Sequence, residues 1–318
     1  MFGFLKNEKK KISIVTPCFN EEDNVELLYE KVKEEFEKLD AYLYEHIFID
    51  NNSVDKTVEK LRSIAKRDCN VKVILNSRNF GPVRSPHYGL LQGSGDATML
   101  VVADLQDPPE LIPEFIAKWE DGNDIVIGVK SESDESPAMY MIRKVYYNFS
   151  NKLSESKLVK NYYGFGLYDK KIIEILDSID DPFPYTRGMI MDLGFKLEKI
   201  YYRQPIRRRG VTSTNFLSLY DIAMLGICSH SKIPLRIATI SGFILSLISF
   251  TLAIIFLALK IIYWDDFPMG TAPIIIGMFF LGSVQIFFIG LVGEYVGHLV
   301  AKLSKFPLVI EKERINFD

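Results

Sequence analysis

The sequence has few of the residues that build zinc sites and disulfide frameworks. Its 318 residues include three cysteines and four histidines. The cysteines lie far apart, at Cys18, Cys69 and Cys228, and none belongs to a CxxC pair. This spacing argues against a disulfide framework and against a zinc site, and it favours a reducing compartment. The histidines are scattered and form no metal-ligand cluster.

Common nucleotide motifs and strong charge are absent too. There is no GxxxxGK[ST] sequence and no GxGxxG after the first expected strand, which disfavours a P-loop or dinucleotide-binding fold. The formal net charge is -3, so no nucleic-acid partner is expected. The N-terminal sequence MFGFLKNEKKK becomes basic after four residues and lacks the long apolar core of a secretory signal peptide.

Long apolar runs are present, but only in the last third of the chain. From Leu235 onward the sequence contains two runs that are each long enough to cross a bilayer, separated by a polar loop with Asp265 and Asp266. Buried helices of a soluble protein are the alternative interpretation. The sequence predicts a membrane region over 233–300, with transmembrane helices at about 235–263 and 271–297.

The charges beside these runs predict their orientation. Lys232 and Arg236 precede the first run, Lys302 and Lys305 follow the second, and the loop between them carries only acidic charge. By the positive-inside rule, the catalytic domain, both termini and a tail over 301–318 are expected in the cytoplasm. Small residues along the second run would allow close helix packing, as in a homo-oligomer: Gly277, Gly282, Gly290, Gly293 and Gly297.

Residues 1–215 have the pattern of an α/β domain. Short apolar runs alternate with helix-like periodicity, so we expect a doubly wound, mostly parallel sheet. Strands are expected at 11–16, 46–49, 71–75, 99–103, 124–128 and 200–203. Asp23 is expected to cap the first helix.

Polar clusters follow four of these strands. They are Asn20 with Glu21, Asp50 with Asn51, Arg78 with Asn79, and Asp104 with Gln106. In doubly wound sheets ligands bind beyond the carboxyl ends of the strands. These clusters are therefore expected to converge on one binding site.

The stretch from Asp104 to Glu110 reads DLQDPPE and follows a buried run. Asp104 and Gln106 carry oxygen ligands two residues apart, which suits Mg²⁺ or Mn²⁺ shared with substrate phosphates. The alternative is an acidic loop that caps the following helix.

Three segments before the first apolar run have two interpretations each. Residues 131–160 form either a mobile lid or an amphipathic helix on the membrane. Residues 216–232 form either an interfacial amphipathic helix or an ordinary core helix. The run Arg207-Arg208-Arg209 binds either lipid headgroups or substrate phosphate, and its place after a strand favours phosphate.

Taken in order, these motifs resemble family 2 glycosyltransferases with the GT-A fold. They are IVTPCFNE at 14–21, DNNS at 50–53, SRNFG at 77–81 and DLQDPPE at 104–110. The two apolar runs narrow the resemblance to enzymes that act on polyprenyl phosphates. It covers nearly the whole chain.

The resemblance implies a role for particular residues. Nucleotide-sugar binding is implied for Pro17, Phe19, Glu21, Asp50, Asn51, Arg78, Ala103, Asp104 and Lys130. Binding of the acceptor or of phosphate is implied for Lys130, Arg203, Arg207, Arg209, Thr212 and Ser213. Asp104 and Gln106 would hold Mg²⁺ or Mn²⁺, and Asp104 and Arg207 would be catalytic.

Several positions depart from the family pattern. Asn51 and Val102 stand where aspartates are common, and Ser213 stands where lysine is common. Gly164-Phe165-Gly166 replaces Asp-Phe-Arg, and two prolines, Pro82 and Pro86, occur where relatives usually begin a regular helix.

The implied reaction is inverting, metal-dependent transfer of a sugar, with glucose from UDP-glucose favoured, to a polyprenyl phosphate at the cytoplasmic membrane face. Two alternatives stay open. One is a polysaccharide-elongating synthase, which usually needs more spans. The other is an inactive membrane scaffold that binds nucleotide-sugar.

Overall fold

A computed structural model describes most of the chain. The described residues are 9–131, 159–205, 224–225, 233–263, 271–303 and 306–317. The structure of the expected lid or amphipathic helix at 131–160 therefore lies almost entirely outside the described residues. The same is true of most of the expected interfacial helix at 216–232.

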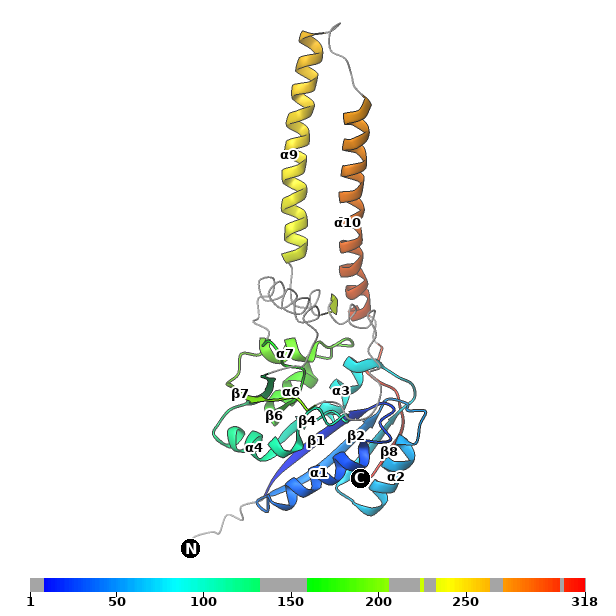
Figure 1. The fold of residues 1–318 in the computed structure, drawn as a ribbon, viewed down its shortest axis with the longest axis vertical. Coiled ribbons are helices and arrows are strands. Elements are labelled where there is room, and N and C mark those ends of the chain that lie inside the picture. Colours follow the sequence, from blue (N-terminus) through cyan, green and yellow to red (C-terminus); the bar gives the residue numbers. More distant parts are fainter. Residues whose placement is uncertain are drawn as a thin grey trace.

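Among the described residues, eight strands form one mixed sheet (Figure 1). The strands are β1 (Lys10–Cys18), β2 (Tyr42–Asp50), β3 (Val71–Asn76), β4 (Ala97–Leu100), β5 (Ile125–Lys130), β6 (Gly166–Asp169), β7 (Leu197–Tyr202) and β8 (Glu311–Ile315). Their order across the sheet is β7-β5-β6-β4-β1-β2-β3-β8. The expected doubly wound α/β sheet is confirmed.

Strand direction decides where the strand ends lie. The strands β4, β1, β2 and β3 are mutually parallel, and β5 is parallel to β7. Strand β6 is antiparallel to both β4 and β5, so those two strands point the same way. The carboxyl ends of six strands therefore share one edge of the sheet.

Helices cover both faces of this sheet (Figure 1). They are α1 (Val25–Glu37), α2 (Thr57–Arg67), α3 (Gly81–Leu91), α4 (Ile112–Glu120), α6 (Lys170–Ser178) and α7 (Thr186–Asp192), with a short 3-10 turn η1 (Pro109–Leu111) before α4. Helices α1, α2 and α4 pack on one face, and α3, α6 and α7 pack on the other. The sheet therefore separates two layers of the hydrophobic core, one on each of its faces. Val15 on β1 lies in the layer beneath α3, whereas its neighbour Ile14 lies beneath α1 and α4, as strand alternation requires.

The expected boundaries need two corrections near the site. The strand expected at 99–103 ends at Leu100, and the next residues already form the loop that carries Asp104. The first helix is preceded by Asn24 instead of Asp23, and the Asn24 side chain donates a hydrogen bond to Glu21 Oε2 (2.6 Å). Because the Asn24 side chain is bonded to Glu21 in the preceding loop, it makes no capping hydrogen bond to the helix.

The end of the chain belongs to the sheet. The tail expected at 301–318 contains β8, which pairs antiparallel with β3 and extends the sheet beyond it. Arg62 on α2 holds Glu313 through two hydrogen bonds (2.6 and 2.5 Å), and Asn316 Nδ2 donates to the Ala65 and Val71 carbonyls. No simple apolar run marks this strand, because its sequence EKERI is charged and only half-buried.

Two long apolar helices extend away from the α/β domain on the side of α3 and α7 (Figure 1). They are α9 (Ile233–Ile262) and α10 (Thr271–Leu303). Both are long enough and apolar enough to cross a membrane. Their large side chains face outward, and Phe243 and Ile286 are 70% and 72% exposed. Exposed apolar surface on this scale is unfavourable in water.

One buried histidine makes the stability of the fold depend on pH. His46 on β2 is fully buried, is hydrogen-bonded to Thr16 Oγ1 (2.9 Å), and its burial lowers its pKa to about 3. The unfolded chain binds this proton near pH 6.5, so lowering the pH from 7 toward 3 favours unfolding.

We therefore expect His46→Gln to weaken the pH dependence of thermal unfolding. At pH 5 the imidazole accounts for a loss of about 2 kcal/mol relative to pH 8, and the variant lacks that loss. The measurement is the unfolding temperature of detergent-solubilised protein at both pH values. An equal drop in wild type and variant would contradict the assignment.

Candidate active site

The residues singled out by sequence lie along one edge of the sheet. Pro17 and Cys18 end β1, Asp50 ends β2, and Lys130 ends β5. Asp104 lies in the loop after β4, and Arg203 directly follows β7. The parallel direction of these strands places all of these positions at the same edge. The expected convergence of the strand-end clusters is therefore seen in the structure.

The loops after β1 and β2 hold each other in place. Asp50 is buried and accepts hydrogen bonds from the Ser53 backbone N–H (3.0 Å) and the Ser53 hydroxyl (2.5 Å). Ser53 in turn accepts from the Asn20 N–H (2.9 Å), and Asn20 Oδ1 accepts from the Val54 N–H. Burial raises the pKa of Asp50, and the Ser53 bonds oppose that shift. The carboxylate thus organises the loops of two neighbouring strands.

Asn51 joins the loops after β2 and β3 through its carboxamide. Its Nδ2 donates to Asn79 Oδ1 (2.8 Å) and to the Gly81 carbonyl (3.3 Å). Its Oδ1 accepts from the Phe80 N–H (2.9 Å) and from Asn76 Nδ2 (3.3 Å). An amide both donates and accepts, whereas an ionised aspartate only accepts. This geometry explains why asparagine stands here in place of the common aspartate.

The DLQDPPE stretch forms a tight turn followed by a helix. Asp104 Oδ1 accepts a hydrogen bond from the Gln106 N–H (3.1 Å), and Leu105 between them has a positive φ of 58°. The first proline of the pair leads into η1, and α4 begins at Ile112. Neither helix start is capped by a side-chain hydrogen bond from this stretch. The alternative interpretation, an acidic loop that caps the following helix, is therefore wrong.

Asp107 is a buried carboxylate that the sequence interpretation left without a role. It is 4% exposed and accepts a hydrogen bond from the Tyr202 hydroxyl (2.9 Å) at the end of β7. Burial raises the pKa of Asp107 to about 6, while the charge of Lys130 and the Tyr202 bond act in the opposite direction. Asp107 therefore connects the loop after β4 to the ends of β5 and β7.

The oxygen ligands of this turn suit a hard divalent cation. Asp104 and Gln106 are half-buried, and Asp107 lies next to them in sequence. The described part of the chain contains no group of three or more His, Cys, Asp or Glu side chains that could hold a metal. Asp104 and Gln106 fit Mg²⁺ or Mn²⁺ if the remaining ligands come from a bound diphosphate and water.

Cationic side chains lie near the same edge. Lys130 Nζ lies 4.2 Å from the centroid of the Tyr163 ring, and Arg187 from α7 lies 5.9 Å from the same ring. Arg78 is exposed and lies 4.1 Å from the ring of Phe80. Positive charge thus borders the carboxylates, as an anionic diphosphate would require.

The remaining predicted residues are placed as follows. Pro17, Phe19 and Glu21 are half-buried in and after β1, and the Glu21 N–H donates to Thr57 Oγ1 (2.9 Å). Ala103 is buried. Arg207, Arg209, Thr212 and Ser213 lie outside the described residues.

The departure at Gly164-Phe165-Gly166 has a steric reason. Phe165 packs between Phe115 and Tyr202, with ring centroids 4.8 and 5.4 Å away. A Cβ at Gly166 would lie 2.8 Å from the Tyr168 hydroxyl and 2.9 Å from the Val126 carbonyl. In this chain, therefore, an arginine at position 166 has no room.

Sequence reasoning missed two contributors to this edge. Tyr202 ends a strand that was expected, but only the fold shows that its hydroxyl reaches Asp107. Arg84 on α3 lies between Pro82 and Pro86, the two prolines that depart from the family pattern, and it is buried with 9% exposure. An arginine between two prolines at the start of a helix is the one sequence signal that could have drawn attention to it.

Comparison with known proteins agrees with this geometry. Residues 13–193 match the family described as Glycosyl transferase family 2. The chain is 33% identical to a prophage bactoprenol glucosyl transferase homolog of Escherichia coli K12, over 95% of this chain and 98% of that protein. It is 32% identical to a bactoprenol glucosyl transferase of Shigella phage SfX, over 96% of this chain and 99% of that protein.

The Asn51 bridge leads to a direct test. Asn51→Asp replaces two N–H donors with a carboxylate facing two acceptor oxygens, so we expect a loss of stability of about 1–3 kcal/mol. Asn52→Asp is the matched control, because Asn52 is exposed with a positive φ of 65° that aspartate tolerates. The measurement is thermal unfolding in detergent. If Asn51→Asp proved as stable as Asn52→Asp, the bridge would have no structural importance.

Proposed function

Because the chain belongs to glycosyl transferase family 2, we propose that this glycosyltransferase moves a sugar from a nucleotide diphosphate-sugar to the phosphate of a membrane polyprenol. UDP-glucose is the favoured donor, and the product is a polyprenyl-phosphate sugar. The names of the relatives, bactoprenol glucosyl transferases, support this acceptor and this sugar. The metal, the donor and the inverting outcome are parts of the same proposal.

One observation carries the proposal. The carboxylates and cations that suit a nucleotide diphosphate lie at one sheet edge, and the chain leads from the same domain into two apolar helices. We propose that α9 and α10 cross the membrane and that the α/β domain lies on its cytoplasmic side. The positive charges beside these helices support that orientation. A water-soluble donor and a lipid acceptor can then meet at the membrane surface.

The residues at this edge have separate proposed tasks. Pro17, Phe19, Glu21 and Asp50 contact the nucleotide, and Asp104 with Gln106 holds the divalent cation. The cation, when bound, neutralises charge on the departing nucleotide diphosphate. Lys130, Arg203 and Arg207 bind phosphate oxygens as guanidinium and ammonium partners.

The acceptor phosphate shapes the rest of the mechanism. A phosphate monoester is already anionic near neutral pH, so its attack on the sugar needs no strong general base. Attack on the side opposite the leaving group would invert the anomeric centre through an oxocarbenium-like transition state, as in inverting glycosidases. The proposed role of the protein is to position both phosphates and to stabilise the developing charge.

The reaction can be tested with purified protein in lipid nanodiscs. Labelled UDP-glucose and polyprenyl phosphate are expected to give an organic-extractable labelled lipid. An insoluble polymer would instead indicate an elongating synthase. Nucleotide-sugar binding without incorporation from any donor would indicate an inactive scaffold.

Asp104→Ala is expected to lower transfer by at least about a hundredfold, because it removes a charged ligand at the reacting diphosphate. Asp40→Ala is the matched control, since Asp40 is exposed in the turn before β2 at the opposite edge of the sheet. Both variants should keep the unfolding temperature of wild type. Full activity of Asp104→Ala would rule out the proposed metal-binding role.

A further inference from the structure

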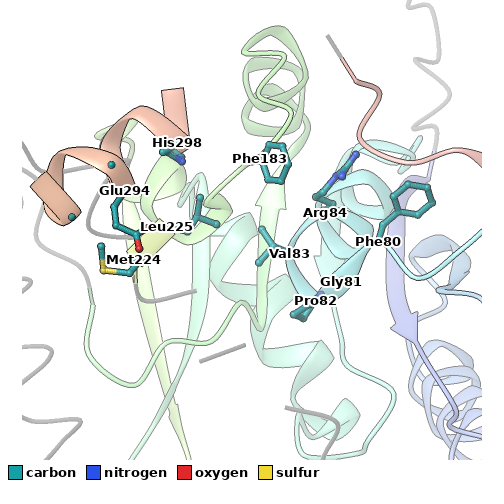
Figure 2. Close-up of a pocket in the computed structure, with 13 residues that line it drawn as sticks. Phe80, Gly81, Pro82, Val83, Arg84, Phe183, Met224, Leu225, Glu294 and His298 are labelled. Atoms are coloured by element: carbon teal, nitrogen blue, oxygen red, sulfur yellow. The ribbon is translucent and has the colours of Figure 1, made fainter. Parts of the chain in front are cut away.

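A large cavity lies between the α/β domain and the second apolar helix (Figure 2). Its volume is about 690 Å³, which is within the range of pockets that hold organic ligands. One wall comes from the start of α3, from Phe80 to Arg84, together with Phe183. The opposite wall is α10, and Met224 with Leu225 closes one side. Among the described residues that line this cavity, none was predicted from sequence to bind a ligand.

The wall on α10 contains three glycines beside Glu294 and His298. Gly290, Gly293 and Gly297 are three and four residues apart, so they lie on one face of the helix. A Cβ at any of these positions would meet nothing within 4 Å. The absence of side chains therefore leaves space in the cavity beside the helix backbone. That space suits a slender apolar chain.

Two contacts hold α10 beside this cavity. Lys302 near the end of α10 pairs with Asp181 (2.9 Å), two residues before Phe183. The chain then continues to Ile310, directly before β8, and the Ile310 carbonyl accepts a hydrogen bond from the Ser77 N–H (2.9 Å). The glycine wall is thus fixed against the domain at the point where the helix reaches it.

Arg84 supplies a buried positive charge to the cavity wall. Its guanidinium lies 5.3 Å from the ring of Phe80 and 5.1 Å from the ring of Phe183. Its Nη2 donates to the Pro307 carbonyl (2.5 Å), whereas its buried Nε has no hydrogen-bond partner. A guanidinium has five N–H donors, and leaving a buried donor unpaired is unfavourable. The bond to Pro307 uses one of these donors, so the guanidinium keeps donor capacity for an anion.

The same part of α3 links the cavity to the active edge, by which we mean the sheet edge formed by the carboxyl ends of the parallel strands and the loops that follow them. Pro82 and Val83 line this cavity and also a smaller one of about 220 Å³, which reaches Leu100 and Gly164. Leu100 is the last residue of β4, four residues before Asp104. Phe80, at the other end of the wall, is hydrogen-bonded to Asn51. An anion at Arg84 would thus lie between α10 and the loops proposed to bind the nucleotide-sugar.

We propose that this cavity binds the phosphate end of the polyprenyl phosphate acceptor, with Arg84 as a phosphate-binding residue and the glycine face of α10 as the wall for the first isoprene units. The proposal rests on the proposed function and adds to it a residue and a site. Glu294 lies on the α10 wall, across the cavity from Arg84 (Figure 2). The Arg84 guanidinium therefore places the phosphate at the α3 wall, and the chain lies along the glycines of α10.

The test compares three variants in nanodiscs. Arg84→Gln is expected to raise the KM for polyprenyl phosphate about tenfold or more, because it removes a charged hydrogen-bond donor. Gly293→Leu is expected to do the same by filling the cavity. Gly282→Leu, on the same helix but not in the cavity wall, is the matched control and should behave as wild type. The affinity for UDP-glucose should change less than twofold in all three.

Arg84 also contacts Pro307, so a structural effect has to be separated from a loss of binding. Arg84→Lys keeps a positive charge and should recover part of the acceptor affinity, whereas a purely structural role would give no such recovery. Unfolding temperatures of all variants are measured alongside. An unchanged KM for polyprenyl phosphate in Arg84→Gln would overturn the proposal, and so would an equal loss of donor affinity.

A binding assay separates this inference from the proposed function. A photoreactive polyprenyl phosphate should label wild type near the cavity, and Gly293→Leu should be labelled much less. Excess phosphatidylglycerol should not compete; if it does, the cavity binds anionic phospholipids in general and the proposal is wrong. Labelling of wild type without sugar transfer would disprove the proposed function but would still support the proposed binding site.

Discussion

The parallel pairing of the strands is the constraint on which the rest of the structure depends. Strand β1 pairs with β2 on one side and β4 on the other, and all three point the same way. Short β6 runs antiparallel between β4 and β5, so β5 and β7 also direct their carboxyl ends to that edge. Residues as distant in sequence as Asp50, Asp104 and Tyr202 therefore meet there. Without this alignment, the same polar loops would be spread over the surface.

Hydrogen bonds between the loops make this edge a single unit. Asn51 connects the loops after β2 and β3, and Asp107 connects the loop after β4 to Tyr202 on β7. Both side chains are buried, and burial makes an unsatisfied polar group costly. The loops are thereby held in one arrangement before any ligand binds.

The C-terminal strand fixes the position of the apolar helix α10 relative to the active edge. The chain leaves α10, passes Arg84 at Pro307, and then pairs with β3 as β8. Bonds from Arg62 and Asn316 anchor this segment at two further points. If α10 lies in the membrane, these contacts determine how far the active edge stands from the lipid. Reaction with a lipid phosphate depends on that distance.

Much of this protein follows from its sequence. Short apolar runs predicted the strands, and apolar residues at helical spacing predicted the helices between them. This is possible because the pattern of residues within one segment determines which of its faces is buried. The two long apolar helices follow from their composition and length. The four strand-end clusters, including Asp104 with Gln106, follow from the rule that parallel strands share an edge. Tertiary structure decided what depends on contacts between distant segments. These contacts pair charged β8 with β3, bury Asp107 against Tyr202, and place Arg84 opposite the glycine face of α10, because pairing and burial arise only when the chain has folded.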